Sequence, residues 1–151
     1  MPESYKQLPK SKYIYRGVEL NDSQYKQYTK GVGIRYSGYG AVAYTTSLEG
    51  LHDFLNDRDS KFAVNRFKLS EFADKIILNV PLWYKLVGEG VQVLSVTGKG
   101  YNHVFKTGHM LKRLVDREQE ILLQDTPKLL TFDIQNSISD KELEFIFRSK
   151  K

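Results

Sequence analysis

The sequence predicts an α+β fold in one domain that covers residues 1–151. Segments that read as short strands outnumber the helical ones, and the two kinds do not alternate in the regular order of a βαβ winding. A length of 151 residues provides enough chain for one hydrophobic core and too little for two comfortable ones. We therefore expect a single domain with more strand than helix.

The N-terminal part of the chain carries clear local signals. Residues 12–16, KYIYR, alternate and are rich in aromatic side chains, which predicts a short strand. Asn21 precedes a polar segment at 22–30 and is placed to cap it as a helix. A glycine-dense loop at 31–40 leads into AVAYTT at 41–46, which predicts a buried strand.

The next element is a helix that begins at Ser47 and ends at about residue 56, with Leu48 and Leu51 on its apolar face. Beyond it the chain is dominated by apolar runs with strand-like alternation. The sequence predicts strands at 62–69, 75–80 and 91–96, a loop at 98–103, a short helix at 110–115, two strands at 118–124 and 128–134 that turn at 125–127, and a last helix or strand at 139–149.

Composition excludes several kinds of chemistry. The chain has no cysteine, which excludes disulfides, thiolate nucleophiles and cysteine-ligated zinc and fits a cytoplasmic location. His52, His103 and His109 are too scattered to predict a metal site. An apolar run of about 18 residues and a secretory signal are both lacking, so we expect no membrane span. The net charge of +5 favours encounters with acidic partners, including nucleic acid.

Two short motifs near the first strands carry polar groups that suit phosphate or sugar binding. Arg16 ends the first predicted strand and is followed by Gly17. Thr45, Thr46 and Ser47 lie where a strand gives way to a helix. Taken alone, each motif has an ordinary structural explanation, an exposed arginine at a turn and a hydroxyl that caps a helix.

A third motif, Glu118-Gln-Glu120, opens a late predicted strand. Residues two apart on a strand point to the same face, so the two carboxylates are expected to be neighbours that disfavour each other's ionisation. A solvated strand face is the ordinary explanation. Asp116 extends the acidic patch, however, and such a patch inside a basic chain is suited to holding a cation.

The order of these motifs resembles the Arg–Ser–Glu class of mono-ADP-ribosyltransferases, most closely the bacteriophage enzymes that modify host proteins. In that family an arginine closes the first strand, as in YIYRGV, a Ser-Thr-Ser motif ends a later strand, as in YTTSLEG, and Glu-x-Glu opens a late strand, as in REQEILL. The helix after the hydroxyl motif delivers an aromatic residue and then an arginine, which match Phe54 and Arg58. The resemblance covers roughly residues 13–134, and Thr45 stands where the family has serine.

The resemblance implies a fold of two packed, mainly antiparallel sheets with flanking helices around an NAD cleft. It implies that NAD is a substrate, that no metal is needed, and that ADP-ribose is transferred to arginine on a host or other target protein with release of nicotinamide. The segment 109–117 would then recognise the acceptor.

The resemblance also assigns roles to individual residues. Glu120 would stabilise the oxocarbenium-like ribose, and Glu118 would orient the attacking guanidinium. Arg16 would pair with phosphate oxygens. The NAD-binding set is Arg16, Gly17, Thr45, Thr46, Ser47, Phe54, Arg58 and Glu120, and the catalytic set is Glu120, Glu118, Arg16 and Thr45.

Two other functions fit parts of the sequence. The positive charge and the ten tyrosines are compatible with a non-catalytic or nucleic-acid-binding module on a degenerate transferase fold. The basic residues do not form one run, however, and the Glu-x-Glu patch would repel phosphates. An NAD glycohydrolase without a protein acceptor is the second alternative.

Overall fold

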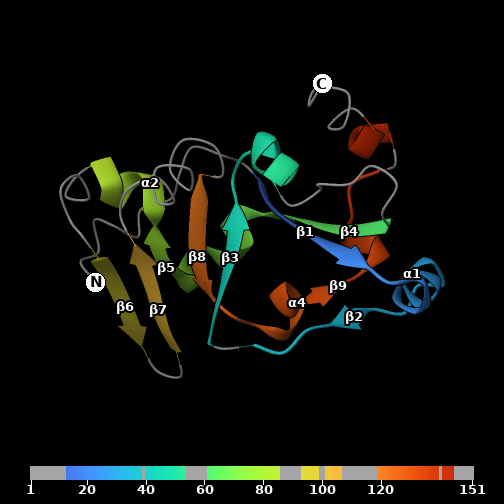
Figure 1. Cartoon of the computed structure of the whole chain (residues 1–151), viewed down its shortest axis with the longest axis horizontal. Helices are drawn as coiled ribbons and strands as arrows, with labels where there is room; N and C mark the ends of the chain where they lie inside the picture. The colour runs from blue at the N-terminus through green and yellow to red at the C-terminus, as the bar shows by residue number, and fades with distance from the viewer. Residues whose placement is uncertain are drawn as a thin grey trace.

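The fold is α+β and is built on a five-stranded antiparallel sheet (Figure 1). The computed structural model describes residues 13–38, 40–53, 61–85, 93–98, 101–106, 119–139 and 141–144. The strand order in the sheet is β4-β1-β3-β8-β5. These strands are β1 (Tyr13–Leu20), β3 (Ala41–Thr45), β4 (Lys61–Lys68), β5 (Ile76–Asn79) and β8 (Glu120–Gln124).

Two small ribbons accompany the main sheet. Strand β2 (Ile34–Arg35) pairs with β9 (Thr131–Phe132), and β6 (Val93–Gly98) pairs with β7 (Tyr101–Lys106). Figure 1 shows the β6–β7 ribbon beyond β5 and the β2–β9 ribbon on the opposite side of the molecule, near α1. The described part of the chain therefore has one large sheet and two short accessory pairs.

The helical segments are short. Helix α1 (Asp22–Thr29) begins after Asn21, whose side chain accepts from the Gln24 amide at 2.8 Å, while the Gln24 side chain accepts from the Asn21 amide at 3.0 Å. This reciprocal capping confirms the predicted start of the helix. The remaining segments are α2 (Val80–Trp83), α4 (Pro127–Leu130) and the 3-10 turns η2 (Leu48–Asp53), η3 (Leu69–Lys75) and η6 (Ile134–Asn136).

Both faces of the main sheet are covered by apolar side chains. On one face, Ile14, Tyr44 and Ile121 pack with residues of η3 and α4. On the other face, Tyr15 and Val64 pack with Leu51 of η2 and with other apolar residues. Since the central strands are buried on both sides, their sequences read as nearly continuous apolar runs.

Several predicted strands are confirmed, and others are wrong in extent or type. The strands predicted at 41–46, 62–69 and 75–80 are present with shifts of a residue or two. The first strand does not end at Arg16, because it pairs with β4 over all eight of its residues and continues to Leu20. The predicted loop at 98–103 is also wrong, since β7 begins at Tyr101.

The strand predicted at 128–134 is mostly wrong. The Thr126 hydroxyl accepts from the Leu129 amide at 3.2 Å and starts the helical turn α4, with Pro127 in its first turn. Only the two residues of β9 form a strand, and they pair with β2 instead of returning along β8. The helix predicted at 110–115 lies outside the described residues.

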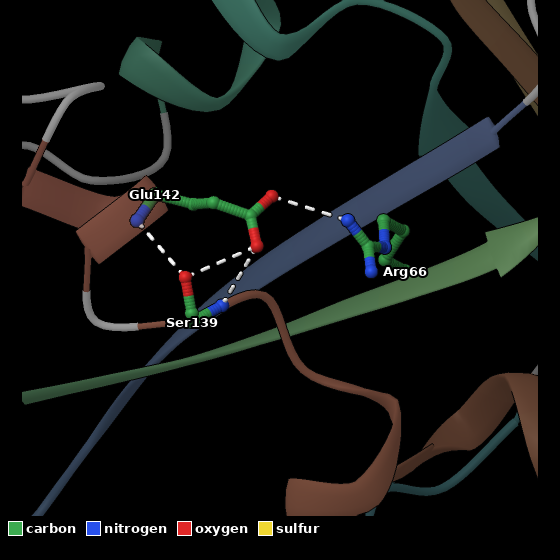
Figure 2. Close-up of polar contacts among 3 residues, drawn as sticks. All are labelled: Arg66, Ser139 and Glu142. Carbon is green, nitrogen blue, oxygen red and sulfur yellow. Dashed lines mark hydrogen bonds and ion pairs between the residues drawn. The ribbon is translucent and has the colours of Figure 1, made fainter.

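The C-terminal turn is capped and attached to β4 (Figure 2). Glu142 Oε1 accepts from the Ser139 amide at 3.2 Å and from its hydroxyl at 3.1 Å, and the Ser139 hydroxyl accepts from the Glu142 amide at 3.1 Å. Arg66 Nη1 lies 3.1 Å from Glu142 Oε2. Residues 141–144 are helical, Ser139 precedes this turn, and residues 140 and 145–149 of the element predicted at 139–149 lie outside the described residues.

Candidate active site

The strand order brings three of the predicted motifs together. Strand β3 lies between β1 and β8 in the sheet. Thr45 is in register with Tyr15 on one side and with Glu120 on the other. Arg16, Thr45 and Glu120, which are far apart in the sequence, therefore lie on three adjacent strands.

Arg16 lies inside β1, where β1 and β3 separate. The two strands are in register only at Tyr15 and Thr45, whereas β1 continues beside β4. One step beyond this point, Arg16 Nη1 donates to the Ala43 carbonyl at 2.6 Å. The guanidinium thus supplies a donor to β3 near the place where the backbone pairing stops.

The charge environment of Arg16 is mixed. Its side chain is half-buried, and burial lowers the pKa of the guanidinium from its ordinary value, while the nearby Tyr44, Glu120 and Tyr36 act in the opposite direction. An arginine with such neighbours keeps its positive charge at neutral pH. Glu120 is half-buried as well, and its Oε2 atom is buried. The charge of Glu120 therefore acts on Arg16 in a partly desolvated part of the sheet. Arg16 lies one residue beyond the Tyr15–Thr45–Glu120 register, so its side chain leaves the sheet on the face opposite to those of Thr45 and Glu120.

The hydroxyl motif forms a compact turn at the end of β3. The Ser47 amide donates to Thr45 Oγ1 at 3.2 Å, and Thr45 Oγ1 lies 3.1 Å from the Ser47 carbonyl, to which it donates. Thr45 is 2% exposed and Thr46 is 8% exposed. The hydroxyl that closes this turn belongs to Thr45, where the sequence predicted that Ser47 would cap the next helix.

Thr46 connects this turn to the residue before Glu120. Its amide donates to the Gln119 carbonyl at 3.3 Å, and its hydroxyl donates to the same oxygen at 2.9 Å. Gln119 has φ of 44°, in the left-handed region that L-residues rarely adopt. Two hydrogen bonds to one carbonyl thus hold a strained residue directly ahead of the candidate catalytic carboxylate.

The predicted start of the late strand is wrong. Strand β8 begins at Glu120, and Gln119 directly before it has a positive φ and is not part of the strand. Glu118 itself lies outside the described residues. So do Phe54, Arg58 and the segment 109–117.

The element after the hydroxyl motif is also different from the prediction. In place of a helix from Ser47 to about residue 56, the described chain forms the 3-10 turn η2, whose Leu51 is fully buried. Gly17 lies beside Arg16 in β1, opposite Val64 of β4. The NAD-binding residues predicted from Arg16 to Ser47 therefore cluster around the β1–β3 junction.

Sequence reasoning missed three residues around Arg16. Tyr44 is 2% exposed, and its hydroxyl donates to the Leu129 carbonyl at 2.7 Å. Asn65 is 1% exposed and in register with Arg16. Tyr36 packs edge-to-face on Phe132, with ring centroids 5.5 Å apart. Of the three, only Asn65 is marked by a sequence pattern, because it is a single amide in the largely apolar segment FAVNRF.

Other kinds of site find no support in the described part of the chain. No group of three or more histidine, cysteine, aspartate or glutamate residues there is placed to hold a metal ion. Among the described residues, no helix combines the length and apolar character needed to cross a membrane. A cavity of about 220 Å³ lies between α1, β4 and the segment 134–143, and its lining does not include Arg16, Thr45 or Glu120.

Comparison of the chain with protein-family models, with curated proteins and with solved structures gave no significant match.

Proposed function

We propose that this protein is a mono-ADP-ribosyltransferase that uses NAD to modify arginine on a target protein and releases nicotinamide. The observation that supports it best is the placement of Arg16, Thr45 and Glu120 on adjacent strands, with Thr45 opposite Glu120. Residues of the three motifs thus lie on neighbouring strands, in addition to following the order of the resemblance. The antiparallel sheet with its smaller second sheet is compatible with the ADP-ribosyltransferase fold, which is part of the proposal.

Glu120 would act on the ribose. When the N-glycosidic bond breaks, nicotinamide leaves with the bonding electrons and positive charge develops on the ribose. A carboxylate fixed nearby stabilises that charge, and it does so more strongly where burial lowers the local dielectric. The burial of Glu120 Oε2 and the anchoring of Gln119 by Thr46 favour this role.

Arg16 would hold the pyrophosphate. A guanidinium has five N–H groups, and only one donation, to Ala43, is made by Arg16 to a described residue. The remaining N–H groups suit a bidentate contact with phosphate oxygens. The contact with Ala43 fixes the arginine before the substrate arrives, which lowers the entropy cost of binding.

The acceptor step would involve Glu118. A nitrogen of the target arginine forms the new bond to the ribose carbon and loses a proton, which a nearby carboxylate accepts. The resemblance assigns that carboxylate to Glu118. We expect the Glu118→Gln variant to lose arginine transfer and to retain some NAD hydrolysis, and an equal loss of both activities would contradict a role confined to the acceptor.

The central test is the Glu120→Gln variant, incubated with labelled NAD and a cell lysate. Replacement of one oxygen by an amide removes the charge and nearly preserves the shape, so we expect transfer to fall about 10²–10³-fold with an unchanged thermal midpoint. Glu19→Gln makes the same substitution at an exposed position of β1 and serves as the control. Unchanged transfer by Glu120→Gln would contradict the catalytic role assigned to Glu120.

The same incubation separates the alternatives. Labelled protein bands indicate a transferase, and free ADP-ribose alone indicates a glycohydrolase. Absence of turnover together with salt-sensitive nucleic-acid binding would indicate a binding module.

A further inference from the structure

We propose that Asn65 is a positioning residue for Arg16. The inference rests on the proposed function where it concerns NAD, but the contacts that carry it do not involve a ligand. Asn65 lies in β4 and is 1% exposed, although its neighbours Ala63, Val64 and Phe67 are apolar. A buried amide in such a strand needs hydrogen-bond partners to offset its loss of hydration.

Asn65 is the cross-strand neighbour of Arg16. The two residues are in register in the antiparallel β1–β4 pair. Directly opposed residues in such a pair project to the same face, with Cβ atoms about 4.5–5.5 Å apart. The amide and the stem of the arginine side chain therefore share one side of the sheet.

The Asn65 amide also reaches the strand that Arg16 binds. Its Nδ2 donates to the Tyr44 hydroxyl at 3.2 Å and to the Thr131 carbonyl at 3.0 Å. The Tyr44 hydroxyl in turn donates to the Leu129 carbonyl. Tyr44 follows Ala43, whose carbonyl accepts from Arg16. One amide thus connects β4 to β3 across β1, at the point where β1 and β3 separate.

Of the two polar groups of the Asn65 side chain, only the NH₂ group is hydrogen-bonded to described residues. Asn65 Oδ1 is buried and has no hydrogen-bond partner among the described residues. A buried acceptor without a donor opposes folding, and leucine would occupy a similar volume without that cost. In Asn65→Leu the removal of the buried oxygen offsets part of the loss of the two Nδ2 bonds. The variant therefore perturbs the surroundings of Arg16 at a reduced cost in stability.

The first experiment observes Arg16 directly, without NAD. In the NMR spectrum of the uniformly ¹⁵N-labelled protein, the guanidinium signals of Arg16 are assigned by their loss in Arg16→Lys. We expect Asn65→Leu to accelerate hydrogen exchange at the Arg16 guanidinium on the order of tenfold, because the carbonyl it binds is held less firmly. Tyr44→Phe, which removes the acceptor of the same amide, should produce a shift in the same direction and serves if Asn65→Leu does not fold.

Asn79→Leu is the matched control. Asn79 is also a buried asparagine of the main sheet, and its side chain caps α2 by accepting from the Leu82 amide at 3.3 Å. The substitution removes the same groups on β5, so it should leave the Arg16 signals unchanged. Unchanged Arg16 exchange in both Asn65→Leu and Tyr44→Phe would overturn the proposal.

The second experiment is a double-mutant cycle on NAD affinity. We expect Asn65→Leu to raise the dissociation constant of NAD about tenfold, equivalent to about 1.4 kcal/mol, and to have no further effect in the Arg16→Lys background. Full additivity would show that Asn65 acts independently of Arg16 and would contradict the proposal. If the unmodified protein binds no NAD, the proposed function fails, while the NMR experiment still decides the role of Asn65.

Discussion

Substitutions at Gln119 test whether the backbone conformation of this residue orients Glu120. The side chain of Gln119 is exposed, so its replacement removes no core packing, and its effect comes from the backbone at φ of 44°. Valine is branched at Cβ and is poorly tolerated in the left-handed region, whereas asparagine and glycine accept it. Gln119→Val therefore perturbs one backbone angle, with Gln119→Asn and Gln119→Gly as matched controls.

The valine variant can lose free energy of unfolding in either of two ways. It either stays in the left-handed region, which a β-branched side chain tolerates less well than glutamine does, or it moves to an extended conformation and turns the Gln119 carbonyl away from Thr46. The second route gives up the Thr46 hydroxyl bond of 2.9 Å and amide bond of 3.3 Å, each worth about 0.5–1.5 kcal/mol. The two bonds together are worth about 1–3 kcal/mol, and the strain relieved by leaving the left-handed region offsets part of this. We therefore expect a net loss of about 1 kcal/mol, or about 2–4 °C in the unfolding midpoint.

Urea and thermal unfolding of the three variants measure this cost, and labelled NAD measures its consequence. We expect Gln119→Val to lose stability and at least about tenfold in the proposed transferase activity, because Glu120 follows directly and a small misplacement is costly. The asparagine and glycine variants accept this conformation more readily than glutamine and should be at least as stable as the unmodified protein. If the valine and asparagine variants are equally stable, the backbone at Gln119 does not carry the strain that its positive φ indicates.

Two further predictions concern stability. A Cβ atom on Gly38 would collide with Asp125 Oδ2 and would lie 2.7 Å from Leu130 Cδ1, and displacement of Asp125 breaks its 2.7 Å bond to the Gly40 amide. Gly38→Ala should therefore cost about 2 kcal/mol in urea unfolding, and a change below about 0.5 kcal/mol would argue against this clash. Burial raises the pKa of Tyr44 from 10.0 to about 12. The folded protein thus holds this proton more tightly, and up to about 2.7 kcal/mol of stability is present below pH 10 and is lost as the pH rises through about 12. Tyr44→Phe should remove most of this alkaline slope, and an unchanged slope in urea titrations at pH 9–12 would show that other groups cause it.

Local signals predicted the fold class and several elements. Asn21 and Gln24 lie three apart ahead of a polar helix, and their reciprocal hydrogen bonds depend on nearby residues alone. Buried strands such as β3 were predicted because continuous apolar runs bounded by turn residues seldom form anything else in a small domain. Such features need no knowledge of the remaining chain.

The errors arose where distant partners override local preference. Gly17 and Glu19 weaken β1 locally, but antiparallel pairing with β4 keeps all eight residues extended. The helical turn α4 was missed although Thr126 followed by Pro127 is a helix-start signal, because the apolar residues after it suggested a strand. The register that sets Thr45 opposite Glu120 depends on the whole sheet, and no local pattern specifies it.

Within the candidate site, the contacts indicate a larger role for Thr46 than for Thr45. The sequence drew attention to Thr45 because the resembling family has serine there, but its hydroxyl bonds the amide and carbonyl of Ser47 and closes a turn that either residue can close. Thr46 instead holds the Gln119 carbonyl, and that contact sets the direction in which the chain enters β8 at Glu120. Arg16 is fixed from the other side by Ala43. Arg16 is thus held by the Ala43 carbonyl of β3, and the residue before Glu120 is held by the amide and hydroxyl of Thr46 directly after β3, so small shifts of β3 should alter both together.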